Sequence, residues 1–397
     1  FETDKLSLES LVEIKPHKKI KFGQNSIFPI SLTHTVPDAV GYVLYTPDGA
    51  IFYTGNFVFD PTMLGAYKTD IGKLAYVGKQ GVLCLLSESL YADKRGFTSP
   101  NHRTNGKIRE ILNRHEGRIL YNIYQAQLYR IQELFNEIME TDRKVVIMGK
   151  RLEGVILKAI DMKYINFDKK RISSIHHVND EKVVILVSDE REKPFSNLQR
   201  IIRGYDKFIT ITPEDTVVFA SPVYDGMEHT ATKIQDNIAR IGADVIELSR
   251  KTFPSHHASS EDLMLMIDLM QPKYYMPVIG EYRHQVANAN VAKRVGIAEE
   301  NILLRLNGEV AYFENGQLVD NGFKVPVDDI LIDGLAAGDV GELVLKDREL
   351  LSDNGIVIIT ATLDKKTKEV LAGPEVLTRG FIFVKDNIDL IKEAEKI

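Results

Sequence analysis

Residues 33–60 read T-H-T-V-P-D-A-V-G-Y-V-L-Y-T-P-D-G-A-I-F-Y-T-G-N-F-V-F-D, and this stretch decides the fold. Two apolar runs, Tyr42–Tyr45 and Ile51–Tyr53, flank a Pro-Asp-Gly turn, which is the pattern of a β-hairpin. A hairpin brings the residues before its first strand and after its second strand to the same end of a sheet. The sequence therefore predicts that His34 and Asn56 are neighbours at one sheet edge, where metal ligands or catalytic groups are commonly held.

Composition describes an ordinary globular protein of 397 residues, with 44% hydrophobic and 27% charged residues. This length predicts two or three domains. The net charge of -6 gives no general attraction to nucleic acid, so any RNA contact must come from local basic patches. The single cysteine, Cys84, lies in an apolar run and is expected to be buried; it fits a cytoplasmic location. No apolar run approaches the ~20 residues of a membrane span, so no membrane contact is expected.

The pattern of the chain changes near residue 101. Before it come strands and turns, ending in the run G-V-L-C-L-L-S-E-S, which predicts a buried strand that delivers Ser87 and Glu88 to a sheet edge. After it, helices and strands alternate, which indicates a parallel sheet covered on both faces. Two further strands, Gly355–Thr362 and Phe381–Val384, are expected in a last, incomplete domain.

Together these motifs resemble the ribonuclease J family, which are metallo-β-lactamase-fold nucleases with a β-CASP insertion. In that family the opening stretch reads T-H-S-I-P-D-S … T-G-D-F-K-F-D, and its His and first Asp both ligate catalytic metal. Here the His is retained as His34, but Asn56 replaces the Asp. The chain begins at Phe1 and contains no H-x-H-x-D-H motif, so we expect a fragment or the ordered part of a longer polypeptide.

The resemblance implies an α/β fold with five segments. A partial metallo-β-lactamase αββα sandwich would be formed by residues 1–100 and 258–322. The inserted β-CASP α/β domain would span residues 101–257, a linker residues 323–350, and the start of a C-terminal α/β domain residues 351–397.

Two-metal hydrolysis of a phosphodiester needs several His and Asp ligands that hold both ions close together. In the family, one such ligand is the His of M-P-I-H-G-E-Y-R. Here the motif is M-P-V-I-G-E-Y-R, and Ile279 occupies that ligand position. Of the three family ligand positions in this chain, only His34 survives, as a remnant. The family uses zinc, manganese or magnesium, but we expect no stably bound ion here.

The β-CASP motifs also lack some of the histidines of the family pattern. The family's F-A-S-N-I-H-R appears as Y-Q-A-Q-L-Y-R, with Tyr129 at the His position and Arg130 retained. Arg130 would bind a phosphate, or else be a surface helix arginine. The family's H-T-S-G-H appears as F-P-S-H-H, with Phe253 at the first His and with Ser255 and His257 retained. His257 resembles the catalytic-pocket histidine, and Ser255 and His257 would bind RNA phosphate; alternatively, the two histidines are exposed loop residues.

A neutral T-G-S-Q-G-E-P loop helps to hold the RNA 5′ end in the family. The matching S-D-E-R-E-K-P segment places three carboxylates where that phosphate should bind, those of Asp189, Glu190 and Glu192. Its two cations, Arg191 and Lys193, compensate this negative charge only partly. Like-charge repulsion is expected to weaken 5′-monophosphate binding. The alternative is a solvated charged loop.

Three functions follow from these patterns. The first is a ribonuclease J-like protein of RNA maturation and mRNA decay, weak or inactive alone, that is the partner subunit of an active paralogue. The second is an active metal-dependent 5′-to-3′ exoribonuclease, also capable of endonuclease cleavage, with a remodelled metal site. The third is a hydrolase of a small substrate, which the β-CASP-like insertion disfavours. The expected partners are single-stranded RNA, an active ribonuclease J paralogue, and a second subunit in a homo- or heterodimer or tetramer.

Overall fold

The computed structural model describes residues 12–189, 195–221, 223, 226–249, 252–253, 255–319, 322–327, 332–333, 336–337, 350–351, 354–379 and 393. The chain divides into two compact units, residues 1–324 and 325–397, which are described separately. Among the described residues, no helix is both long enough and apolar enough to cross a membrane. Cys84 is 1% exposed, as the sequence predicts.

The first sheet of the larger unit is built around the predicted hairpin. It has the strand order β1-β2-β3-β4-β5-β12. The strands are β1 (Ile20–Phe22), β2 (Asn25–Ser31), β3 (Val40–Thr46), β4 (Gly49–Tyr53), β5 (Cys84–Glu88) and β12 (Tyr274–Val278). Strands β1 to β4 are antiparallel, whereas β5 runs parallel to both β4 and β12. Strands β5 and β12 are paired although the whole second sheet, described below, lies between them in the chain, so that second sheet is an insertion into this one.

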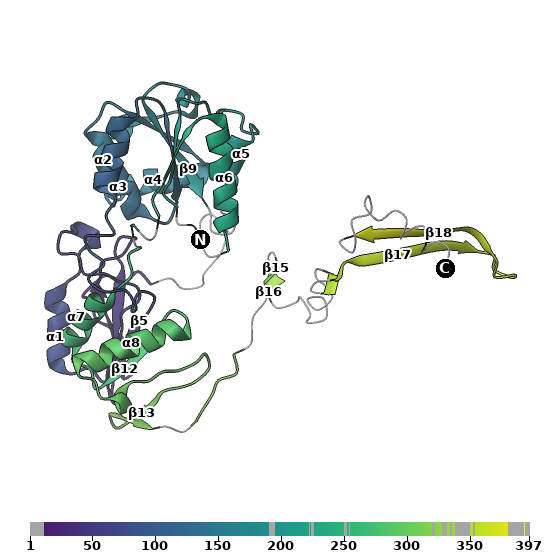
Figure 1. Ribbon diagram of the computed structural model, residues 1–397. Helices are drawn as coiled ribbons and strands as arrows, with labels where there is room; N and C mark the ends of the chain where they lie inside the picture. The colour runs from purple at the N-terminus through teal and green to yellow at the C-terminus, as the bar shows by residue number, and fades with distance from the viewer. Residues whose placement is uncertain are drawn as a thin grey trace. The chain divides into compact units, whose positions relative to one another are not determined.

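One face of this sheet is covered by three helices, α1 (Ile71–Gln80), α7 (Ser260–Met270) and α8 (Tyr282–Val295) (Figure 1). Their apolar faces pack with Phe52 and Leu85 of the sheet in one buried cluster. Helix α1 begins where Asp70 accepts a hydrogen bond from the Lys73 N–H, and α8 ends at Gly296 in a left-handed conformation. This sheet and its helical layer are the partial sandwich that the sequence predicts.

Helices α1 and α7 approach closely at Gly78. A Cβ atom at this position would lie 1.9 Å from the carbonyl oxygen of Leu269. We expect Gly78→Ala to force the two helices apart and to lower the free energy of unfolding by about 1–3 kcal/mol in urea titration. Gly154→Ala, in a helix where no atom lies within 4 Å of the new Cβ, should stabilise the protein by about 0.5–1 kcal/mol. Equal effects of the two variants would contradict the close packing.

The inserted sheet is entirely parallel and has the strand order β11-β10-β6-β9-β7-β8. Its strands are β6 (Ile119–Tyr124), β7 (Lys144–Met148), β8 (Ile172–Ser173), β9 (Val183–Asp189), β10 (Thr216–Phe219) and β11 (Asp244–Glu247). Helices α2 (Asn105–Arg114), α3 (Leu128–Met139) and α4 (Lys150–Asp161) share the apolar cluster of one face. Helices α5 (Ser196–Ile202) and α6 (Glu228–Ile241) pack on the other (Figure 1). The expectation of a parallel sheet with two covered faces is confirmed.

The two connections between the sheets are fastened to each other. The Thr98 hydroxyl lies 2.7 Å from the Ser259 hydroxyl and donates to the His257 carbonyl oxygen at 2.6 Å. The Thr98 N–H donates to Asp262, which also accepts the N–H of Phe59. The chain therefore enters and leaves the inserted domain at one place.

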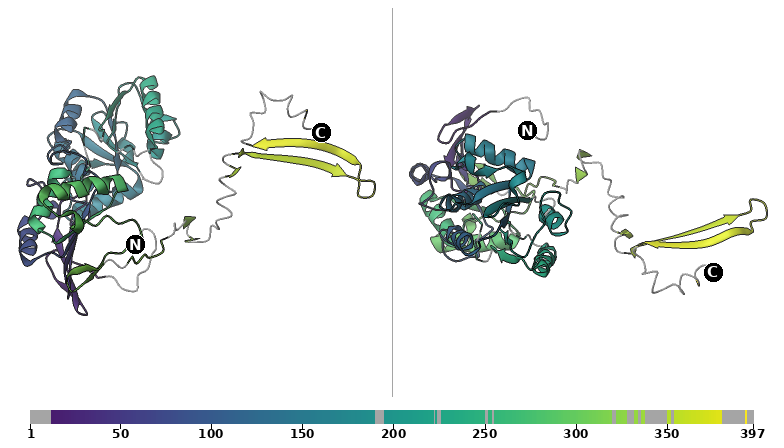
Figure 2. Two further views of the ribbon diagram at one scale, coloured as in Figure 1. Left: turned by 60° about the horizontal axis from the view of Figure 1, so that its bottom comes forward. Right: turned by 90° about the horizontal axis from the view of Figure 1, so that it is seen from above.

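The remaining elements are short. The described part of the larger unit also contains the hairpin of β13 (Tyr312–Glu314) and β14 (Gln317–Val319) and the 3-10 helices Gly65–Tyr67, Lys169–Arg171, Ile175–His177 and Glu299–Asn301. The described part of the second unit holds a small pair, β15 (Ile332–Asp333) and β16 (Ala336–Ala337), and a long antiparallel pair, β17 (Ile356–Leu363) and β18 (Val370–Arg379) (Figure 2). The strand predicted at Phe381–Val384 and most of the predicted linker lie outside the described residues.

Candidate functional site

The segments that carry His34 and Asn56 lie side by side at the end of the first sheet. The Val58 N–H donates to the Thr33 carbonyl oxygen at 3.1 Å, in an isolated antiparallel bridge. His34 donates from Nδ1 to the His256 carbonyl oxygen at 2.9 Å, and its ring lies 5.8 Å from that of His257. Burial, together with the nearby His257, lowers the pKa of His34 to about 4. His34 is therefore neutral at pH 7.

Glu88 connects three segments at this edge. The residue is fully buried at the last position of β5. One carboxylate oxygen accepts the N–H groups of Phe57 and Ala258, at 2.7 and 3.2 Å. The other accepts a hydrogen bond from Nδ1 of His257 at 2.7 Å. The carboxylate thus fixes the orientation of the imidazole and leaves Nε2 available to a substrate.

His257 also packs against an aromatic ring. The side chain is 18% exposed, and its ring makes an edge contact with Tyr91 at 5.4 Å. The Tyr91 hydroxyl accepts the N–H of Ser255 at 3.3 Å, and the Lys94 Nζ lies 3.2 Å from the centroid of the Tyr91 ring. Because His257 is largely buried and His256 is completely buried, the alternative of two exposed loop histidines is wrong.

Two further histidines fill the interior behind this edge. His102 and His256 are both fully buried, and their rings meet edge-on at 4.3 Å. Within the described residues, their ring nitrogens make no hydrogen bond, although His102 Nε2 lies 3.4 Å from a carboxylate oxygen of Asp60. Burial lowers the pKa of His102 to about 4, and burial and the neighbouring His102 hold the pKa of His256 well below its usual range. Both rings are therefore neutral at pH 7.

Arg130 lies in the interior rather than on a helix surface. It is 8% exposed and donates to Glu133 at 2.9 Å, and Glu133 also accepts from the hydroxyl and N–H of Thr104. Burial raises the pKa of Glu133. Arg130 and Ser255 line the same small cavity, whose volume of about 20 Å³ has room for a water molecule but not for a phosphate. The alternative of a surface arginine is wrong.

The other replaced positions carry apolar or aromatic contacts. Tyr129 packs edge-on against His256 at 5.1 Å and against Tyr67 at 5.5 Å. Phe253 packs against the apolar cluster of the inserted sheet. Both side chains thus contribute packing and offer no imidazole nitrogen to the site.

The donor atoms of this edge do not fit a two-metal centre. His34 offers one nitrogen, Asn56 one neutral oxygen, and Ile279 no donor atom. The buried Oδ1 of Asn56 has no hydrogen-bond partner within the described part of the chain. In that same part, no group of three or more His, Cys, Asp or Glu side chains is arranged to hold a metal ion. These residues alone hold too few ligands, so we derive no metal-dependent step from them.

Ile279 has a strained backbone. Its φ is 57°, a left-handed conformation that β-branched residues rarely adopt, and its carbonyl oxygen accepts the N–H of Ser89. Histidine tolerates this conformation better than isoleucine does. We therefore expect Ile279→His to raise the free energy of unfolding by up to about 1 kcal/mol, measured by urea titration. Ile297→His, at a partly buried position packed on the same sheet, should be destabilising, and a loss at Ile279 as well would argue against strain there.

The structure thus brings the predicted residues His34, Asn56, Ser255, His257 and Arg130 to one region. Sequence reasoning missed the roles of Glu88, Tyr91, His102, His256 and Glu133. For Glu88 a signal was present, because the strand that ends in S-E-S delivers it to this edge. The acidic segment of residues 190–194, and the side chain of Asp189, lie outside the described residues.

Comparisons with known proteins agree with this architecture. Residues 116–238 match the ribonuclease J β-CASP domain, residues 245–303 a Zn-dependent metallo-hydrolase RNA specificity domain, and residues 343–397 the ribonuclease J C-terminal domain. The chain is 37% identical to ribonuclease J2 of Bacillus subtilis over 98% of its own length and 70% of that protein. The chain belongs to the ribonuclease J family.

Two other members of the family are similar to nearly the same extent. Ribonuclease J 1 of Streptococcus pyogenes is 34% identical over 98% of the chain and 70% of that protein. Ribonuclease J 2 of Staphylococcus aureus is 34% identical over 95% of the chain and 68% of that protein. As a ribonuclease J family member, the chain carries the metallo-β-lactamase fold with a β-CASP domain inserted between β5 and β12.

Proposed function

We propose that this ribonuclease J family protein acts in RNA maturation and mRNA decay as the weakly active or inactive partner of an active ribonuclease J paralogue. The observation that carries the proposal is the pair of replaced ligand positions, Asn56 and Ile279, beside a retained His34. The relatives' names support RNA as the class of substrate. A homo- or heterodimer or tetramer is the proposed assembly, and the reducing cytoplasm, which suits a single buried cysteine, is the proposed compartment.

The side chains around His257 support a role in binding RNA. Glu88 orients His257, and the Nε2 of that imidazole is the group we propose to contact the scissile phosphate. Arg130 is committed to Glu133, so its proposed contribution to phosphate binding is electrostatic rather than a direct contact. Ser255, whose N–H donates to the Tyr91 hydroxyl, is the second residue that we propose to contact this phosphate.

A second candidate function is favoured by the intact Glu88–His257 pair. An active metal-dependent 5′-to-3′ exoribonuclease with a remodelled metal site would retain such a pair next to the reacting phosphate. Zinc, manganese or magnesium would then need further ligands in addition to the residues at the sheet edge of His34. This candidate requires that RNA hydrolysis depend on His34.

Degradation of a 5′-monophosphorylated single-stranded RNA tests both functions. The protein is assayed with manganese or magnesium, alone and mixed with an active paralogue. We expect negligible activity alone and altered activity in the mixture. Release of mononucleotides by the protein alone, lost in His34→Ala, would overturn the partner function and establish the second candidate.

Metal binding gives an independent test of the replaced ligand positions. In a polypeptide that also carries the N-terminal H-x-H-x-D-H motif of the family, Asn56→Asp with Ile279→His should raise zinc affinity about tenfold or more. Each single variant should show a smaller gain, measured as bound metal after dialysis. No gain in the double variant would mean that these two positions are not the family's ligand positions.

A further inference from the structure

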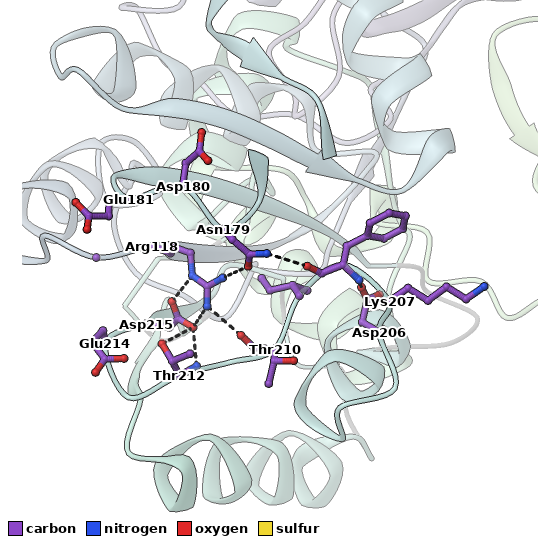
Figure 3. Close-up of a pocket in the computed structure, with 13 residues that line it drawn as sticks. Arg118, Asn179, Asp180, Glu181, Asp206, Lys207, Thr210, Thr212, Glu214 and Asp215 are labelled. Carbon is purple, nitrogen blue, oxygen red and sulfur yellow. Dashed lines mark hydrogen bonds and ion pairs between the residues drawn. The ribbon is translucent and has the colours of Figure 1, made fainter. Parts of the chain in front are cut away.

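Two of the cavities that the described residues of the inserted domain line differ in their chemistry. The first, of about 550 Å³, lies at the amino ends of β6, β9 and β10 (Figure 3). Its arginine, Arg118, donates to both carboxylate oxygens of Asp215 at 2.7 and 2.6 Å, to Asn179 at 2.7 Å and to the Thr210 carbonyl oxygen at 2.9 Å. These interactions fasten three segments together, so Arg118 acts as a structural crosslink in this cavity.

The second cavity, which we call the α4–α5 groove, has about 520 Å³ and is lined by residues 147–150, 153, 175, 187, 197, 200, 201 and 205–208. It lies where the neighbouring strands β7 and β9 end and where the chain leaves them toward opposite faces of the sheet. Helix α4 packs in the cluster of one face and α5 in that of the other. Ligands of open α/β sheets bind in such crevices, outside the carboxyl ends of strands whose helices diverge.

The walls of the groove combine an apolar floor with aromatic and cationic rims. Met148 and Val187 belong to a buried apolar cluster and contribute to the floor. Tyr205 and Phe208 form part of the rim, where they are 74% and 45% exposed. Exposed aromatic rings beside cations are the surface on which single nucleotides stack.

The cations of the groove are only partly neutralised. Arg200 pairs with Asp206 at 3.0 Å, and the Asp206 side chain is 4% exposed, so this pair contributes to structure. Lys150 and Lys207 also line the groove, and the described residues provide no ion pair to either. Among the described lining residues, Lys150, Arg200 and Lys207 face two acidic groups, Asp206 and Glu153, which leaves one positive charge in excess.

We propose that the α4–α5 groove binds a nucleotide unit, with the base on Tyr205 and Phe208 and the phosphate at Lys150 and Lys207. The unit is either a free nucleoside monophosphate or one nucleotide of a single-stranded RNA, because both present the same base and phosphate. The groove is separate from the site of His34 and Glu88, so nucleotide binding here does not depend on the proposed partner function.

Binding is measured by titration calorimetry on the full chain in the presence of a chelator, so that no RNA is hydrolysed. The probes are 5′-AMP, adenosine and a single-stranded oligoadenylate with a 5′ hydroxyl. Lys150→Ala with Lys207→Ala should weaken 5′-AMP binding about tenfold or more and leave adenosine binding unchanged. Tyr205→Ala should weaken both. The matched control combines Lys144→Ala and Tyr312→Ala, exposed residues of the same unit outside the groove, and should change neither.

The affinity for the oligoadenylate, compared with that for 5′-AMP, distinguishes an RNA strand from a free nucleotide as the ligand. Binding about tenfold tighter than that of 5′-AMP, with crosslinks from 4-thiouridine RNA to residues 196–208, would assign the groove to an RNA strand. Equal or weaker binding of the oligomer would assign it to a free nucleotide. If 5′-AMP does not bind, or binds equally well to the groove variants and the control, the proposal is wrong. Such a result would leave the partner function unaffected, because that function is tested by RNA degradation.

Discussion

Glu88→Ala should lower the free energy of unfolding by about 3–5 kcal/mol, the largest effect that we expect from one substitution. The change leaves the buried N–H groups of Phe57 and Ala258 without their acceptor and removes the partner of His257. Glu88→Gln keeps an acceptor oxygen of similar shape and should lose only about 1–2 kcal/mol. Urea titration monitored by circular dichroism measures both values.

A surface carboxylate provides the matched control for this prediction. Glu299 pairs with Lys293 at 2.6 Å, but its side chain is 80% exposed. Glu299→Ala should therefore change stability by less than about 0.5 kcal/mol. If Glu88→Ala costs no more than this control, Glu88 does not connect the three segments in solution. The same variant should also abolish any RNA-dependent role of His257, which Glu88→Gln should partly retain.

Acidification should destabilise the protein between about pH 6.5 and pH 4. In the unfolded chain histidine titrates near 6.5, whereas burial lowers the pKa of His34 and His102 to about 4 in the folded state. The unfolded state therefore binds more protons in this window, so the stabilising contribution is complete above it and is lost as the pH falls. His256, with its pKa also lowered, acts in the same direction. Each histidine contributes roughly 1.4 kcal/mol per pH unit.

The groups around these rings determine the size of the effect. Arg130 lowers the pKa of both His102 and His256, whereas Asp60 raises that of His102. His102→Gln and His256→Gln should each lower the number of protons taken up on unfolding in this pH window by about one, and so reduce the slope of the unfolding free energy against pH. A wild-type stability that is flat across this window would show that these rings are not held neutral.

Local patterns were sufficient to predict most of the fold. The Pro-Asp-Gly hairpin and the strand that ends in S-E-S depend on apolar runs and turn residues, and both lie where they were expected. Helix α3, with apolar residues at helical spacing on one buried face, belongs to the predicted alternation of helices and strands after residue 101. Helices α1 and α6 also have an apolar stripe at helical spacing.

The site was less predictable, because its contacts join residues that are far apart in the chain. The sequence indicates that Glu88 ends a strand, but not which distant N–H groups it accepts. The meeting of His102 and His256 depends on how the loop before α2 packs against the loop before α7. The ion pair of Arg130 with Glu133 follows helical spacing, whereas its burial depends on distant residues that line the same cavity, such as Tyr121 and Leu248.

The hydrogen bonds of Thr98 have a consequence for the origin and the engineering of this protein. Its hydroxyl lies 2.7 Å from that of Ser259, so the two ends of the inserted domain are almost in contact. A module whose ends meet can be gained, lost or exchanged as a cassette without disturbing its host. A short turn from Thr98 to Ser259 would delete the cassette and leave the pairing of β5 with β12 in place. The α4–α5 groove lies in the inserted domain, whereas His34, Asn56 and Ile279 lie in the host domain, so the two regions are free to diverge independently.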